Sequence, residues 1–500
     1  MAETELPQRH PWGLYTLFFT EMWERLSYYG MRALLVLFMT DSVRGGMGLT
    51  DKVAGSIYGL YTAGVYLAAL PGGWLADRLL GAQRAVWYGG IIIAAGHFTM
   101  AIPKTETFFL GLVLVVIGTG LLKPNVSAMV GDLYPEGGAR RDAGFSIFYM
   151  GINLGAFIGP LVCGVLGEKH NWHYGFAAAG VGMVLGLTQY RLSRKHLGTA
   201  GLRPGHEGGI SRGQKIAVLL SVSLLGLAVA GGMAGIIKID PVGLASGTTV
   251  LLVSVAIIYF GFVFFFSGLD STGRKRVGLI AILCLAAALF WAGFEQAGSS
   301  FNLFADRYTA RKFGGEMPAG WFTARTISGE IPASWFQALG PIFVITLAPV
   351  MAVLWVRLGR RNLDPSLPMK FGLGLMLLAC GFVVMAGAAV FVARGQKVWP
   401  TWLITTYLLH TFGELCVSPV GLSSVTKLAP RHLVGQMMGA WFLASSFGNL
   451  IAGRIAGGFD PNALDRMPGR FLQMVILPVT VGALLMVLAR PIKRLMAGAR

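Results

Sequence analysis

Hydrophobic residues fall into long runs along this chain, and short polar stretches separate the runs. Fourteen runs reach the length of about 20 residues that a helix needs to cross a bilayer. We expect a transmembrane helix at each of 13–40, 51–76, 84–103, 107–131, 142–167, 174–190, 215–237, 246–268, 276–304, 334–358, 370–393, 399–427, 432–457 and 471–490. The pattern therefore predicts an all-α membrane protein with 14 transmembrane helices.

Charged residues interrupt the first run. At about 100° per residue, Glu21, Arg25 and Arg32 share one helix face with Tyr28, and Glu24 lies at the edge of that face. A charge in lipid costs at least about 2.5–3.5 kcal/mol on insertion scales, so such residues face protein or water and mark functional pathways. We expect this stripe to line a polar cavity. The alternative is a structural network of ion pairs between helices.

Composition and charge support the membrane assignment. Of the 500 residues, 54% are hydrophobic and 13% charged, which excludes an ordinary soluble protein. The net charge of +18 has a simpler source than nucleic-acid binding, since Lys and Arg collect in cytoplasmic loops. If both termini lie in the cytoplasm, most of the Lys and Arg residues outside the spans fall in cytoplasmic loops and tails. The four cysteines lie in apolar runs without paired spacing, so we expect packing residues and no disulfide.

The seventh and eighth runs carry no buried charge, and removing them leaves six spans on each side. Two six-span halves are typical of a transporter with internal repeats. We therefore expect an N-terminal bundle over 1–195, a linker with two additional helices over 196–275, and a C-terminal bundle over 276–500. The alternative is a single bundle of fourteen. Residues 305–333 form the longest exterior loop, which we interpret as a lid or a short hairpin.

Polar and aromatic residues inside the other runs are candidates for a site. They are Tyr29, Tyr66, Lys123, Tyr149, Asn153, Trp291, Glu295, Glu414, Ser418 and Trp441. For Trp441 a packing role and a pocket wall are equally compatible with the sequence.

The second run ends in Pro71-Gly72-Gly73-Trp74-Leu75-Ala76-Asp77-Arg78-Leu79-Leu80-Gly81, which resembles the signature loop of the major facilitator superfamily. In it Gly73 would let helices approach, and Asp77 and Arg78 would pair across a cytoplasmic gate. The alternative is a plain turn.

Residues 21–30 read E-x-x-E-R-x-x-Y-Y-G, which resembles the hallmark of the proton-dependent oligopeptide transporters. Tyr149-x-x-x-Asn153-x-Gly155 and Gly413-Glu414-x-x-x-Ser418-Pro419 are similar to two further motifs of that family. The resemblance runs nearly end to end, and the extra pair of spans resembles the bacterial members. It implies a major facilitator fold and proton-coupled import of di- and tripeptides by alternating access.

Two positions depart from the family pattern. Gly340 stands before Pro341 where the family often has Asn, which removes one hydrogen-bonding group. Gly59 stands where animal members carry a His before the second-span Tyr. We interpret the lone His97 and His410 as packing residues, and assign proton coupling to carboxylates.

The charges inside the spans are basic on balance in the N-terminal half and acidic in the C-terminal half, so a cavity between the halves would match the two ends of a short peptide. Arg32 and Lys123, with Arg25, would bind its carboxylate, and Glu414 its ammonium group. The other substrate contacts we expect are Tyr29, Tyr66, Tyr149, Asn153, Trp291, Ser418 and Trp441. The resemblance implies coupling through a Glu295–Arg32 ion pair, and Glu21 and Glu24 beside Arg25, with Lys123, would form a second switch.

Other functions find less support. A membrane enzyme would need a nucleophile with an adjacent base or a cluster of metal ligands, and an ATP-driven pump a G-x-x-x-x-G-K-[ST] loop; none of these is present. We expect no enzyme, no cofactor and no metal. Some relatives of the family carry nitrate, amino acids or other organic anions, and this stays an alternative. The expected partners are di- and tripeptides, protons and membrane lipid, with no nucleic acid, for a monomer in the bacterial cytoplasmic membrane.

Overall fold

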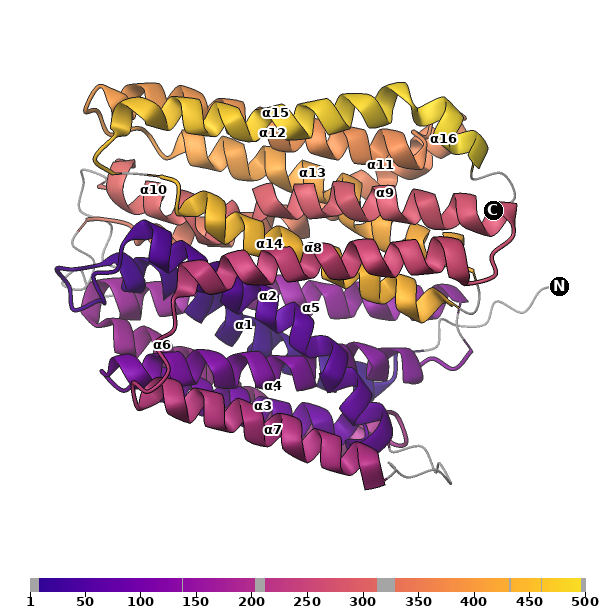
Figure 1. The fold of residues 1–500 in the computed structure, drawn as a ribbon, viewed down its shortest axis with the longest axis horizontal. Coiled ribbons are helices and arrows are strands. Elements are labelled where there is room, and N and C mark those ends of the chain that lie inside the picture. Colours follow the sequence, from indigo (N-terminus) through magenta and orange to yellow (C-terminus); the bar gives the residue numbers. More distant parts are fainter. Residues whose placement is uncertain are drawn as a thin grey trace. The chain divides into compact units, whose positions relative to one another are not determined.

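The computed structural model describes residues 9–136, 138–202, 212–312, 329–430, 433–459 and 461–495, and these residues are mostly helical (Figure 1). The α-helices are α1 (Trp12–Thr40), α2 (Asp51–Leu75), α3 (Ala82–Met100), α4 (Thr105–Asp132), α5 (Gly138–Gly164), α6 (Trp172–Ser193), α7 (Arg212–Met233), α8 (Pro241–Phe266), α9 (Ser271–Phe294), α10 (Ser300–Tyr308), α11 (Leu339–Arg360), α12 (Leu367–Ala393), α13 (Thr401–Leu428), α14 (Val434–Ala456), α15 (Met467–Val487) and α16 (Ala489–Leu495). Short π-helices extend two of them, η1 (Ala76–Leu80) and η2 (Val165–His170). Short 3₁₀ helices adjoin others: η3 (Arg194–Leu197), η4 (Glu295–Gly298), η5 (Ala333–Ala338) and η7 (Leu464–Arg466).

Every one of the fourteen predicted spans contains a helix, so the all-α prediction is confirmed. Within the described part of the chain, nine helical stretches are long and apolar enough to cross a membrane. Helix α1 is not among them although it has 29 residues, because Glu21, Glu24, Arg25 and Arg32 lie along it.

The ninth predicted span is not one continuous helix. Helix α9 ends at Phe294, η4 follows, and α10 begins at Ser300. The three elements together form one helical stretch, Ser271–Tyr308, that is long and apolar enough to cross a membrane, so the span expected over 276–304 is present. Within a membrane, irregular backbone is tolerated where protein or a water-filled cavity surrounds it, and such breaks occur at transporter binding sites.

The chain forms two compact units. The first contains residues 1–31, 68–167 and 173–238, and the second contains 32–67, 168–172 and 239–500. Helix α7 belongs to the first unit, where it contacts α4, and α8 belongs to the second, where it contacts α9 and α14. The domain boundaries drawn from the sequence stay a prediction.

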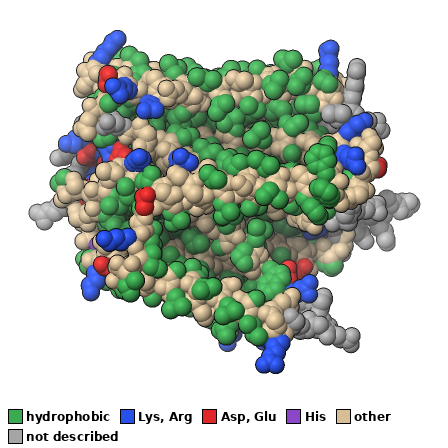
Figure 2. All heavy atoms as spheres, viewed as in Figure 1, with side chains coloured by type: hydrophobic (Ala, Val, Ile, Leu, Met, Phe, Trp, Pro, Cys, Tyr) green, Lys and Arg blue, Asp and Glu red, His purple; other side chains and the backbone are tan. Residues whose placement is uncertain are grey.

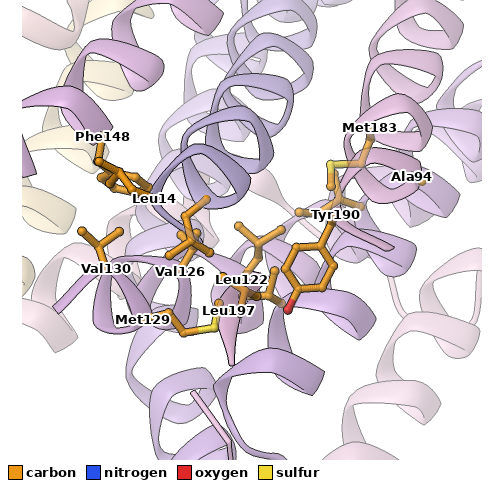
Figure 3. Close-up of a cluster of buried hydrophobic side chains, with 13 residues drawn as sticks. Leu14, Ala94, Leu122, Val126, Met129, Val130, Phe148, Met183, Tyr190 and Leu197 are labelled. Carbon is orange, nitrogen blue, oxygen red and sulfur yellow. The ribbon is translucent and has the colours of Figure 1, made fainter. Parts of the chain in front are cut away.

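In the first unit, α3 packs along α4 (Figure 1), and buried apolar side chains from α1, α4, α5 and α6 meet in one cluster (Figure 3). Leu14, Val126 and Phe148 belong to this cluster. Glycines bring α1 and α5 together: a Cβ at Gly155 would lie 2.1 Å from the carbonyl oxygen of Met22. This close approach places the charged turn of α1 directly against α5.

In the second unit, α12 packs along α13 and α15, and α14 packs along α9. Helices α2 and α14 approach at glycines, since a Cβ at Gly55 would lie 2.4 Å from the carbonyl oxygen of Gly453.

All four cysteines are free thiols. The cysteines Cys163, Cys284 and Cys416 are buried, as expected for packing residues. Cys380 is exposed, so the packing interpretation is wrong for it: its side of α12 faces outward.

The predicted exterior loop begins later than expected, because α10 continues to Tyr308. Lys312 and Glu330 form an antiparallel bridge at its base, and the backbone N–H of Ile331 donates to the carbonyl oxygen of Arg311 at 3.0 Å. The described ends of the loop thus pair as a hairpin does, and residues 313–328 lie outside the described part.

Candidate functional site

The first unit contains a buried cluster of charges on α1. The Nε atom of Arg25 lies 3.0 Å from Oε1 of Glu21 and also contacts Oε2 of Glu24. The guanidinium carbon lies 5.2 Å from the centre of the Tyr28 ring. Each of the three charged residues is at most 3% exposed. Lys123 on α4 lies within electrostatic range of all three, so two acids and two bases share one region.

Three carboxylate oxygens of this cluster are buried and form no hydrogen bond with a described residue: Oε2 of Glu21 and both oxygens of Glu24. Leaving a buried acceptor unsatisfied costs about 1–3 kcal/mol, and more when the group is charged.

Asn153 and Tyr149 lie one turn apart on α5, as their spacing predicts. The Asn153 amide donates to the Tyr149 carbonyl oxygen at 3.0 Å, and the Tyr149 side chain is 41% exposed. Tyr29 on α1 is partly exposed. The Asn153 side-chain amide is therefore held by its own helix.

The loop after α2 combines close helix packing with exposed charge. A Cβ at Gly72 would lie 2.0 Å from the Gly120 carbonyl oxygen, while one at Gly73 would lie 3.8 Å from Pro124. It is therefore Gly72 that brings α2 and α4 into contact. Asp77 and Arg78 lie on the wide turn η1, are exposed, and form no ion pair with another described residue.

The second unit contains an ion pair at the helix break. Nη2 of Arg32 contacts Oε2 of Glu295, the first residue of η4, and Nε of Arg32 donates to the Tyr58 hydroxyl at 2.8 Å. All three side chains are buried. Gly298 is required beside them, because a Cβ there would lie 2.0 Å from the Tyr58 hydroxyl oxygen.

Glu414 on α13 lies within electrostatic range of Glu295 and is half-buried. Arg32 pairs with Glu295, so this group carries one net negative charge when all its members are ionised. Ser418 follows one turn later and is also half-buried. The Tyr407 hydroxyl donates to the Ala297 carbonyl oxygen at 3.3 Å and thereby fixes the break.

The aromatic candidates have different surroundings. Trp291 is half-buried, contacts the Phe294 ring edge to face at 5.4 Å, and its indole N–H has no partner among the described residues. Trp441 is 5% exposed, and a Cβ at Gly421 would lie 2.2 Å from its ring. The surroundings of Trp441 are those of a packing residue. Tyr66 is half-buried.

Sequence reasoning missed several polar contacts of the second unit. Tyr58 is one, although a tyrosine inside an apolar helix needs a hydrogen-bond partner. Asp51 and Arg307 are another: Arg307 donates to both carboxylate oxygens of Asp51, at 2.6 and 2.8 Å. They stand at the predicted exterior ends of their spans with opposite charges, a signal that the sequence contained.

A larger network surrounds the base of the exterior loop. Nη2 of Arg311 lies 2.9 Å from Asp306 and 3.2 Å from Glu330. Glu168 accepts hydrogen bonds from the backbone N–H groups of Ala333 and Ser334, at 2.8 and 2.9 Å. These contacts hold the start of η5 and the two ends of the loop together.

Comparison with known proteins places this chain among the major facilitator transporters. The sequence profile described as the POT family matches residues 83–464. The peptide transporter YePEPT of Yersinia enterocolitica is 43% identical, over 97% of this chain and 95% of the relative. The di-/tripeptide transporter of Lactococcus lactis subsp. cremoris is 36% identical, over 98% and 97% of the two chains.

A solved structure agrees with these relatives. The crystal structure of peptide transporter POT in complex with sulfate has a TM-score of 0.87 and 41% identity, and the match covers 99% of this chain and 98% of that one. The chain therefore belongs to the POT family. The family resemblance and the major facilitator fold predicted from the sequence are confirmed.

Proposed function

We propose that this protein is a proton-coupled symporter that imports di- and tripeptides by alternating access. The observation that carries the proposal is the buried Arg32–Glu295 ion pair at the break between α9 and α10, with Glu414 close by. Arg32 pairs with Glu295, and Glu414 interacts electrostatically with Glu295, so a proton and a charged ligand can each rearrange this group. The named relatives are peptide transporters, which supports peptide as the cargo.

Coupling follows from the cost of breaking a buried ion pair. A buried arginine that loses its partner is left as an uncompensated charge, which costs about 3–5 kcal/mol. Protonation of Glu295 frees Arg32, and a peptide carboxylate then takes the place of the lost partner. Proton and peptide thus favour the same state, and each promotes binding of the other.

Glu414 supplies the opposite charge for the peptide's ammonium group. A short peptide that offers both a carboxylate and an ammonium satisfies Arg32 and Glu414 together. Because these contacts recognise the two ends of the peptide and not its side chains, we expect the protein to accept many different di- and tripeptides. The contacts assigned to Arg25, Tyr29, Tyr66, Lys123, Tyr149, Asn153, Trp291, Ser418 and Trp441 stay predictions.

The cluster of Glu21, Glu24 and Arg25 is a second protonation switch in this proposal. Its support is the buried Glu24 oxygen without a donor. A carrier of a simple anion such as nitrate has little use for this group or for Glu414, so the acidic residues favour peptide and proton. The proposed location is the bacterial cytoplasmic membrane, with both termini in the cytoplasm and the protein acting as a monomer. No chemical change of the substrate is proposed.

Uptake by proteoliposomes tests the function. An inward proton gradient should drive accumulation of a labelled dialanine, and an excess of unlabelled di- or tripeptide should compete, whereas nitrate or free alanine should not. Accumulation that ignores the gradient, or that nitrate inhibits as strongly as peptide does, would contradict the proposal. Mass analysis of the recovered dialanine should find it unaltered.

A further inference from the structure

A groove on the second unit has no part in the site described above. It lies between α9, α14 and α15 and has a volume of about 500 Å³. Its walls are apolar, and include Leu285, Phe447, Ile451 and Leu477. Helix α9 contributes Ala288 and Ala292, one turn apart, and these small side chains leave the space open.

One end of the groove is basic. Arg454 comes from the last turn of α14, Arg470 from the first turn of α15, and Gln473 follows Arg470 by one turn. A smaller adjoining cavity of about 90 Å³ shares Arg470 and adds Arg466. All three arginines are exposed, and none forms an ion pair with another described residue.

Among the described residues, those that line the two cavities include no aspartate or glutamate. Of the residues that the structure describes, Asp465 is the nearest acid in the sequence; it is exposed and lies outside both linings. Asp460 lies outside the described part of the chain. A ligand at this end therefore meets guanidinium groups, which bind phosphate through paired hydrogen bonds. The cation of a zwitterionic head group would find no acidic partner among the described lining residues.

The remaining length of the groove suits a hydrocarbon chain. From Arg470 to Leu477 the groove follows α15 for about 10 Å, at 1.5 Å per residue. Hydrophobic side chains cover the middle of α8, α9 and α15 on the face shown in Figure 2, as expected for a surface in contact with lipid. Arg454 and Arg470 stand in the terminal turns of their helices, and the ends of membrane-spanning helices are where lipid head groups lie.

We propose that this groove binds one anionic phospholipid, with its phosphate on Arg454 and Arg470 and an acyl chain along α15. The bound lipid would brace α9 against α14 immediately before the break at Glu295. A contact at that place already exists, since the Gln296 side chain donates to the carbonyl oxygens of Ala292 and Ala452, both at 3.1 Å.

Native mass spectrometry of the full-length protein in detergent tests the proposal. Wild type should retain one dioleoyl-phosphatidylglycerol at a concentration where dioleoyl-phosphatidylcholine is mostly lost. Arg454→Gln with Arg470→Gln should lower the phosphatidylglycerol occupancy about tenfold or more, because both charge-assisted hydrogen bonds to the phosphate are lost. The phosphatidylglycerol occupancy of each single variant should lie between that of wild type and that of the double variant.

The matched control is Arg394→Gln with Lys397→Gln, which removes two exposed cations that line neither cavity. It should retain the lipid. Equal losses in the control and in the groove variant, or unchanged occupancy in the groove variant, would overturn the proposal.

A further arm separates the lipid from its head group. Dihexanoyl-phosphatidylglycerol and inorganic phosphate, at the same concentration, should not displace the dioleoyl lipid; displacement by phosphate alone would show an anion site without a chain site and would overturn the proposal. The thermal midpoint of each variant without lipid should equal that of wild type, because the mutated side chains are exposed. If the double variant has a lowered midpoint, Arg470→Gln alone is tested instead. Unchanged phosphatidylglycerol occupancy in that single variant would also overturn the proposal.

Discussion

Position 298 has no room for a side chain. A methyl group there would lie 2.0 Å from the Tyr58 hydroxyl oxygen and 3.1 Å from Nε of Arg32, which hydrogen-bond each other. Gly298→Ala should therefore separate that pair and destabilise the protein by about 1–3 kcal/mol, as overpacking does. Thermal unfolding in detergent measures the change.

Gly340→Ala is the matched control, because a Cβ at Gly340 would meet no heavy atom within 4 Å. Its midpoint should stay close to that of wild type. Equal midpoints for both variants would show that the Arg32–Tyr58 contact does not depend on Gly298.

Glu414 is assigned to the ammonium group of the peptide, and this role predicts a selective defect. Glu414→Ala should weaken binding of peptides with a free amine far more than binding of the same peptides with an acetylated amine. The loss on free-amine peptides should reach about tenfold or more, as expected for a charge-assisted hydrogen bond. Competition against a labelled peptide measures both affinities, and equal losses would refute the assignment.

At the scale of elements, the turn after α1 depends on one carboxylate. Asp41 accepts hydrogen bonds from the Trp172 indole at 3.0 Å and from the backbone N–H groups of Arg44 and Gly46, at 2.9 and 3.2 Å. Burial alone would raise the pKa of Asp41, but the Trp172 bond, the Arg44 charge and the backbone donors together lower it below the ordinary value.

A lowered pKa in the folded state stabilises the protein above the pKa of the unfolded state, and this stability is lost as the pH falls through the folded value. The thermal midpoint of wild type should therefore fall as the medium becomes more acidic than about pH 4, the ordinary Asp range. Asp41→Asn should have a lower midpoint at neutral pH and a flatter acid profile. Asp465→Asn, at an exposed site, should follow the wild-type profile, and an Asp41→Asn profile parallel to it would contradict the account.

Hydrophobic runs were enough to predict the helices, because length and apolar content alone decide whether a segment can span a bilayer. They could not predict the break at Glu295, since the residues around it are compatible with a helix. Long-range contacts decide it: Arg32 holds Glu295, and Gln296 donates to Ala452.

The candidate site divides in the same way. Spacing within one helix predicted that Arg25 would lie beside Glu21, a contact of 3.0 Å. Tyr58, in contrast, became visible as the partner of Arg32 only in three dimensions, because nothing local in the sequence links residues 26 positions apart.

At the scale of the whole molecule, the distribution of Lys and Arg predicts the orientation in the membrane. Lys and Arg are enriched in the short loops on the cytoplasmic side of a membrane. Both termini and the stretch 191–215 should therefore be cytoplasmic. A single cysteine introduced at position 203, which lies outside the described residues, should react with a membrane-impermeant maleimide only after the cells are opened. Labelling of intact cells would reverse the topology.

The central claim is that Glu295 couples proton movement to peptide movement through its ion pair with Arg32. Glu295→Gln keeps the shape and hydrogen-bonding reach of the side chain but cannot take up or release a proton. A structural role makes a different prediction: breaking a buried ion pair leaves Arg32 unpaired and damages the fold.

Proteoliposomes with this variant distinguish the two by comparing gradient-driven accumulation with counterflow, the exchange of labelled for unlabelled peptide without net proton movement. If Glu295 couples proton to peptide, Glu295→Gln should abolish accumulation driven by a proton gradient and retain at least part of the counterflow. Accumulation at the wild-type level, or joint loss of counterflow, peptide binding and thermal stability, would contradict this coupling.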